Sequence, residues 1–272
     1  MRRFALLAAV SLVVLPACQE REMTRAEAST AVSESALEAE ASHVVSAPIE
    51  ISTNFTIGKA LKDAATELKS FVASQLPCAK VDVVDNTVTT VWGTTAGCSY
   101  KGATLTGTSQ VSIKRNDDGT VQVDHVWTDM SNGRVRVSGT ANVTWSKADA
   151  SRHIKHDLTW TRLSDGRSGH GTGDRTQRLL DPSKGLAGGI GVDGNRTWTS
   201  ARGTWNVAIT GVQFRLQDPV PQAGSYTVTN PDGKLLTIEF TRRSETEIVV
   251  EVSNGKTTFS FVVKSTGVIA DA

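Results

Sequence analysis

His125 and His156 are the residues whose types and spacing come closest to a reactive pair. Each lies in a stretch of alternating apolar and polar residues, in phase with the apolar ones, and each is next to an aspartate, Asp124 or Asp157. Because strand residues of like phase share one face, both imidazoles are expected to point inward. Inward histidines on neighbouring strands could bind a metal or act as acid and base. The alternative is two partly buried histidines satisfied by hydrogen bonds.

A second group of candidates lies in the glycine-rich stretch 166–194. Arg167, His170 and Arg175 could together meet an anionic group, since loops over a sheet are where binding concentrates. The alternative is simple exposure to solvent. The stretch lacks the Lys-Ser/Thr and the following helix that a glycine-rich phosphate loop requires, so a nucleotide site is not expected.

Other catalytic patterns are missing from the sequence. There is no Gly-x-Ser-x-Gly elbow for a serine nucleophile, and no spacing singles out two carboxylates for glycoside hydrolysis. We therefore expect no catalytic residue, no metal and no cofactor. His125 and His156, with Asp124 and Asp157, remain the candidates for an alternative function, an envelope hydrolase or a metal-dependent enzyme.

The elements that would position these residues are strands. From Val81 onward the apolar pattern has period two, most cleanly in 135–145, and Asn-Gly or Asp-Gly turns such as Asn132-Gly133 separate the stretches. Gly-Thr recurs every 32 residues, at Gly107, Gly139, Gly171 and Gly203, as expected if one unit is a long hairpin. Short turns join antiparallel neighbours, so the topology should be a meander.

One helix precedes the strands. Between Thr56 and Pro77 apolar residues recur at intervals of three and four, and charged residues occupy the opposite face. A long sheet cannot leave an apolar face wet, so it must curl or be covered. The predicted fold is mainly β: one large curled antiparallel meander sheet, half-barrel or sandwich-like, with one N-terminal amphipathic helix. Residues 55–272 would form a single domain, in which 222–272 could be a small C-terminal sub-sheet.

The N-terminal residues indicate where in the cell the protein is located. Arg2 and Arg3 precede a twelve-residue apolar run, too short to span a bilayer as a helix, that ends in Leu15-Pro16-Ala17-Cys18. These four residues resemble the lipobox of bacterial lipoproteins, and the resemblance covers residues 1–18 only. It implies a signal peptide over 1–17, lipid on Cys18 and, with Gln19 following, sorting to the outer membrane. The alternative is an ordinary secretory leader cleaved after Ala17.

If the chain is exported, an oxidising compartment favours a disulfide between the cysteines other than Cys18, and the segment after Cys18 connects the lipid to the body. With Cys18 lipidated, Cys78 and Cys98 remain, and in an oxidising compartment they most simply form one disulfide. Residues 18–54 are rich in Glu, Ala, Ser and Thr and hold few apolar residues, which predicts a flexible acidic tether with at most transient helix near 26–41.

The overall charge excludes one class of partner. Lys and Arg number 29 and Asp and Glu 28, a formal net charge of +1, so nucleic acid is not expected to bind. Membrane contact is expected through the lipid on Cys18. Together these features predict an outer-membrane lipoprotein of the bacterial envelope without enzymatic activity. Its sheet would bind an apolar, lipid-like ligand or an envelope protein partner.

Overall fold

The computed structural model describes most of the chain after the leader. The described residues are 22–58, 64–93, 97–100, 103–115, 120–146, 151–184, 188–215 and 218–271. The predicted signal peptide and Cys18 lie outside these ranges.

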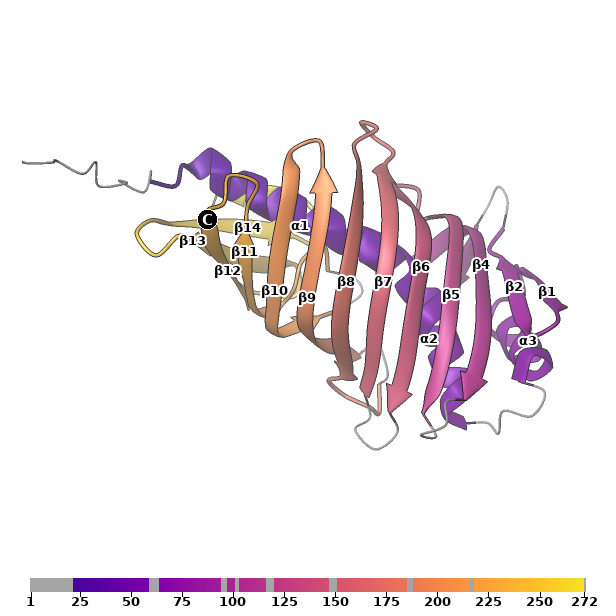
Figure 1. The fold of residues 1–272 in the computed structure, drawn as a ribbon. Coiled ribbons are helices and arrows are strands. Elements are labelled where there is room, and N and C mark those ends of the chain that lie inside the picture. The colour runs from indigo at the N-terminus through magenta and orange to yellow at the C-terminus, as the bar shows by residue number, and fades with distance from the viewer. Residues whose placement is uncertain are drawn as a thin grey trace, which may run out of the picture.

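The body is one antiparallel sheet of 15 strands (Figure 1). The strands are β1 (Lys80–Val84), β2 (Thr87–Val91), β3 (Cys98–Tyr100), β4 (Ala103–Arg115), β5 (Val121–Ser131), β6 (Val135–Ser146), β7 (Ser151–Arg162), β8 (Ser168–Leu179), β9 (Ile190–Ser200), β10 (Gly203–Phe214), β11 (Ala223–Thr229), β12 (Leu235–Arg242), β13 (Glu247–Ser253), β14 (Thr258–Lys264) and β15 (Ile269–Asp271). Except for β3, which pairs with β4 alone, each strand lies beside its neighbours in the chain.

The expected mainly β class and the antiparallel meander are confirmed, and the sheet is open, with β1 and β15 at its two ends. β11 pairs with β10 over residues 223–229, so the last five strands continue the same sheet and do not form a separate one. The antiparallel pairing of β10 with β11 runs from Asn206 to Thr210 and resumes at Gln213 after a register shift.

The region expected to be a flexible tether is structured instead. Residues Arg25–Val44 form helix α1 and Ser46–Gly58 form helix α2, and together they run obliquely across one face of the sheet, here called the inner face (Figure 1). Thr24 and Glu27 make a reciprocal capping box at the start of α1. Alanine and glutamate favour helix locally, and the inner face supplies the burial that the segment cannot provide alone.

The joint between the two helices has a local cause. Val45 keeps a helical conformation, with φ −89° and ψ −6°, but the regular helix ends at Val44. Pro48 has no N–H to donate to the carbonyl of Val44, four residues earlier, and its ring crowds that carbonyl. The Ser46 hydroxyl donates to the Ser42 carbonyl at 2.9 Å beside the break. α1 and α2 are therefore two segments joined at a proline-weakened turn.

The predicted helix over 56–76 is found in part. Helix α3 spans Ala64–Gln75 and buries Leu68 and Val72, while residues 59–63 lie outside the described ranges. α3 contacts β1, β2 and β4, at the end of the sheet where β1 lies. The N-terminal part of the predicted helix, up to Gly58, belongs to α2.

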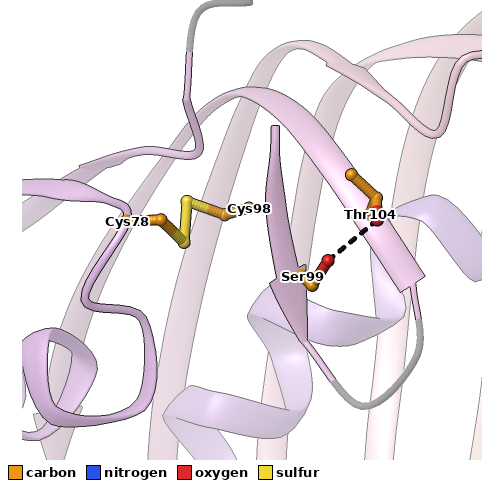
Figure 2. Close-up of a disulfide and its surroundings, with 4 residues drawn as sticks. All are labelled: Cys78, Cys98, Ser99 and Thr104. Atoms are coloured by element: carbon orange, nitrogen blue, oxygen red, sulfur yellow. Dashed lines mark hydrogen bonds between the residues drawn. A yellow bond between two sulfur atoms is a disulfide. The ribbon is translucent and has the colours of Figure 1, made fainter. Parts of the chain in front are cut away.

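The disulfide between Cys78 and Cys98 is confirmed (Figure 2). It joins the segment after α3 to β3, with the two Cα atoms 5.6 Å apart. Beside it, the hydroxyls of Ser99 and Thr104 share a hydrogen bond of 2.9 Å across the β3–β4 pair. The bridge closes a 20-residue interval and holds the short strand β3 against the body.

Two glycines of the Gly-Thr repeat, Gly139 and Gly171, allow a neighbouring strand to approach closely. Paired residues place Trp127, Gly139, Leu158, Gly171, Trp198 and Trp205 in one row across the inner face from β5 to β10. A Cβ atom on Gly171 would lie 3.2 Å from that of Trp198. Glycine on β8 thus leaves room for Trp198, whereas a Cβ atom on Gly139 of β6 would meet the backbone of β7, 2.2 Å from the Asp157 carbonyl oxygen.

Candidate functional site

The candidate site is the layer between α1–α2 and the inner face, where acidic and basic side chains are buried together. The helices bring Glu34, Glu38 and Glu50 into this layer, all buried. The sheet brings arginines from three consecutive strands, Arg152 on β7, Arg175 on β8 and Arg196 on β9, here called the arginine track. Buried charges are expensive unless paired, so their partners decide what the layer does.

Glu38 and Arg196 form the central pair. Their side chains are 6% and 2% exposed, and Arg196 Nη1 donates to Glu38 Oε2. The Ser42 hydroxyl donates to the other carboxylate oxygen at 3.1 Å, and the Arg196 guanidinium lies over the Tyr226 ring, 5.1 Å from its centroid. Charge-assisted bonds in so dry a place are short and strong, and the loss of one partner leaves a buried charge.

Further pairs continue toward the N-terminus of α1. Glu34 accepts from Arg167 and, at 3.3 Å, forms an ion pair with Arg202. At the start of the helix Glu27 pairs with Lys234 at 2.6 Å, and hydrogen bonds from Lys234 and the Thr24 backbone lower the pKa of Glu27 to about 2. The acids of α1 therefore meet one cation from β9 and others from the turns that precede β8, β10 and β12.

The second half of the layer lies under the α1–α2 joint and α2. Arg152 donates to Gln177 at 2.9 Å, and burial lowers its pKa to about 10, while the charge of Glu50 opposes that shift. Burial likewise lowers the pKa of Arg175 to about 10. The hydrogen bond found for the Arg175 guanidinium joins Nη2 to Nδ1 of His156, at 3.1 Å. Arg175 therefore contacts a neutral ring. Its neighbours in the arginine track, Arg152 and Arg196, instead lie near Glu50 and Glu38.

The predicted inward orientation of His125 and His156 is found, but the two are not joined in one site. They are paired with Ala141, which lies between them on β6, so two strand spacings, roughly 10 Å, separate their backbones. His125 Nε2 lies 3.3 Å from the Ser52 hydroxyl of α2, and its ring stacks on Trp127 with centroids 5.3 Å apart. The helix α2 thus covers His125.

The electrostatics of both rings favour the neutral form. Burial, helped by the charge of Arg152, lowers the pKa of His125 to about 3. Burial and Arg175 lower that of His156 to about 2. Asp124 and Asp157 sit on the opposite face, where Asp124 accepts from Asn142 at 2.6 Å and Asp157 pairs with His170 at 2.7 Å. The aspartates adjacent in sequence are therefore not partners of the two histidines.

The three candidate anion ligands are also separated. Arg167 pairs with Glu34 of α1, His170 lies on the outer face beside Asp157, and Arg175 is buried on the inner face. His170 and Arg175 are five residues apart on β8, and an odd interval along a strand places side chains on opposite faces. They do not form one anion site.

Open space flanks α1 on two sides. A cleft of about 340 Å³ lies at its N-terminal end, lined by residues that include Glu27, Arg202 and Trp205. Another of about 280 Å³ lies along its C-terminal half, lined by residues that include Glu40, His43 and Arg134. An apolar pocket of about 10 Å³ sits under α2, beside Trp92. Within the described ranges no cluster of three or more His, Cys, Asp or Glu side chains is arranged to hold a metal ion.

Comparison with known proteins gives no match: no protein-family model, curated protein or solved structure is significantly similar to this chain. None of the helices that the structure describes combines the length and the apolarity needed to cross a bilayer.

The arginine track and its acidic partners were not predicted from the sequence. Two signals for them exist. Arg152, Arg175 and Arg196 each stand in phase with apolar residues of their strands, and Glu27, Glu34 and Glu38 recur at intervals of seven and four, the spacing of one helix face. Charged residues at inward positions on both partners indicate a buried ionic layer.

Proposed function

We propose that this chain is a lipid-anchored protein of the bacterial envelope, without enzymatic activity, whose sheet binds a protein partner. The observation that carries the proposal is that the inner face already holds polypeptide: α1 and α2 lie across it and meet it with matched charges. A surface built to hold a helix is suited to a protein, and less suited to an apolar ligand, which could not satisfy buried arginines.

The anchoring part of the proposal is supported by the lipobox-like Leu15-Pro16-Ala17-Cys18 and by the disulfide. A structural disulfide fits an oxidising compartment, which exported chains reach. Five residues, 19–23, separate Cys18 from the Thr24 cap of α1. A lipid on Cys18 would therefore hold the body close to the outer membrane.

The alternative, an envelope hydrolase or a metal-dependent enzyme using His125 and His156, has weaker support. Such an enzyme needs two groups that converge on a substrate. Here the rings are held apart by β6, and Ser52 and Arg175 contact them individually.

Two measurements on the full chain test the proposal. Labelling of growing cells with a radioactive fatty acid should mark the wild type and not the Cys18→Ser variant. Native mass spectrometry after mild detergent extraction should then detect a protein bound in stoichiometric amount. A stoichiometric extra mass that extracts as lipid, or a bound zinc ion, would contradict the proposed partner class, and an unlabelled wild type would contradict the anchor.

A further inference from the structure

The contact of α1 with the sheet depends on charge more than on apolar burial. The helix buries mainly small or polar residues, among them Ala28, Ala31, Ser35, Ala39 and Ser42. Burial of alanine and serine removes little apolar surface from water, so the hydrophobic contribution per residue is small. What places α1 in register is the series of acids that meet cations of the sheet, with Glu38 against Arg196 at its centre.

The sheet carries more buried arginine donors than the acids of α1 pair with. Glu38 faces Arg196 on β9, and Glu50 lies near Arg152 on β7, but the strand between them, β8, presents Arg175 to a neutral histidine. Nε of Arg175, and Nε and Nη2 of Arg196, have no hydrogen-bond partner within the described part of the chain. A helix with an acid opposite each strand would satisfy these donors better than α1 does.

α1 can also leave without taking α2 with it. The break at Val45 and Pro48 makes the two helices separate segments. α2 is held independently, through buried Ile49 and Ile51 and through the contact of Ser52 with His125. Release of α1 would uncover Arg196, which Glu38 contacts, Arg175, whose charge acts on His43, and Trp205, which lines the cleft beside Glu27. Trp205 stacks on Trp198 with centroids 6.0 Å apart.

We propose that Arg175 and Arg196 of the arginine track, with the flanking tryptophans, form a receptor surface for an acidic helix of a partner protein, and that α1 is its resident, displaceable occupant. The inference rests on the proposed function, of which it names the surface and the partner chemistry. The partner helix would be acidic, with small residues between acids spaced three or four apart, because the tryptophans already fill the space that larger side chains would need.

The proposal implies competition within the chain. While α1 is docked the surface is occupied, and a partner binds only to the fraction of molecules in which α1 has dissociated. A helix whose extra acid reaches Arg175 would displace α1 by its greater affinity. The same step would free residues 22–44 to extend, so that the body could move farther from its anchor.

The test uses the full chain and a fluorescein-labelled peptide of residues 24–45, with binding measured by fluorescence anisotropy. The Ala31→Pro variant breaks α1 in its middle without altering any acid or any residue of the sheet. Ala31→Pro should bind the peptide at least ten-fold more tightly than the wild type. A peptide carrying Ser42→Glu, one turn after Glu38, should bind Ala31→Pro several-fold more tightly still.

Arg175→Gln supplies the matched control. Added to Ala31→Pro, it should abolish the advantage of the Ser42→Glu peptide over the unmodified peptide, which places no acid opposite β8. A merely structural role of Arg175 would weaken both peptides equally. The Glu34→Gln/Glu38→Gln variant of the full chain opens the surface by a second route, in case Ala31→Pro fails to fold.

Several outcomes would overturn the proposal. One is that neither opened variant binds the peptide although circular dichroism shows an intact sheet. Another is equal binding of a peptide with Gln at 34 and 38, which would exclude recognition of acids. Saturable binding of dodecanoate in place of the peptide would assign the surface to a lipid, and dimers of the opened variants would assign it to a second copy of this chain. Fatty-acid labelling of Cys18 reports on the anchor separately, so failure of the proposed function is distinguishable.

Discussion

At the scale of single residues, the two buried histidines couple folding to pH. Both have a pKa in the folded protein well below the ordinary value of 6.5, about 3 for His125 and about 2 for His156, because burial disfavours the charged ring. Below pH 6.5 the unfolded chain therefore binds protons that the folded chain excludes. Stability is fully present above that pH and is lost as the pH falls.

His125→Gln is expected to weaken this pH dependence. One buried histidine contributes a slope of about 1.4 kcal/mol per pH unit between roughly pH 6 and pH 4, because one proton separates the two states. Urea denaturation at intervals of half a pH unit should show the slope of the variant lower by that amount. Thr172→Ala, a non-titrating change on the exposed outer face, is the control, and an unchanged slope for His125→Gln would contradict the buried neutral ring.

The ion pair of Glu38 with Arg196 belongs to the same scale. Glu38→Gln leaves the Arg196 charge buried without its counter-ion, which costs about 3 kcal/mol or more. Because α1 can open locally, hydrogen exchange should detect the loss as an approximately 100-fold fall in the protection of α1 amides. Glu251→Gln, an exposed glutamate on β13, should leave that protection unchanged, and similar effects of the two variants would refute the pairing.

At the scale of elements, the glycines of strand β8 allow the neighbouring strands to pack against it. Three glycines of β8 lie on the inner face: Gly169, Gly171 and Gly173. Side chains from both neighbouring strands lie over them, namely Trp160 and His156 of β7 and Trp198 of β9. A Cβ atom at position 173 would lie 2.3 Å from Cε1 of His156. The large side chains of β7 and β9 thus use space that β8 leaves empty, and this lets the strands pack without strain.

Gly173→Ala is therefore expected to destabilise the protein by about 1–3 kcal/mol, the usual cost of overpacking. Thr172→Ala, on the exposed outer side of the same strand, should cost less than about 1 kcal/mol. Chemical denaturation of both variants is the measurement. The Gly173→Ala/His156→Ala double variant should lose less stability than the sum of the two single variants, and an additive double variant would show that the two positions do not compete for space.

At the scale of the whole molecule, the two ends of the sheet differ in their expected distance from the membrane. The N-terminus of α1 lies at the end that carries β11–β14, and β1 and β2 lie at the other (Figure 1). Six Cα steps join Cys18 to Thr24, so a lipid on Cys18 would hold the near end within roughly 20 Å of its attachment point.

Energy transfer on vesicles checks this geometry. A donor dye on Asp232→Cys, beside the start of α1, should transfer more strongly to headgroup-labelled lipid than the same dye on Asn86→Cys, in the turn between β1 and β2. Release of α1 by Ala31→Pro should reduce the difference, since the body is then held less closely. Equal transfer from both positions in the wild type would contradict a docked α1 beside an anchored Cys18.

The division between local and tertiary information is visible in particular elements. The alternation in 135–145 and the Asn-Gly turns are local patterns, and the strands and the meander followed from them. Such patterns suffice because hairpins pair nearest neighbours and need no information from distant parts of the chain. The disulfide followed from the expected oxidising compartment and from the two cysteines that remain besides Cys18.

The segment 22–58 shows the opposite case. Its composition by itself indicates a flexible acidic chain, because it cannot bury enough of its own surface to offset the entropy of ordering. The inner face is built from strands far along the chain, and Arg196 lies 158 residues from Glu38. It supplies the missing burial and the arginines that pair with the acids of the segment. The amino-acid sequence alone thus determined a long antiparallel sheet with one disulfide. Only the tertiary structure decided that the acidic segment is a helix on that sheet, because its counter-charges exist only once the strands have come together.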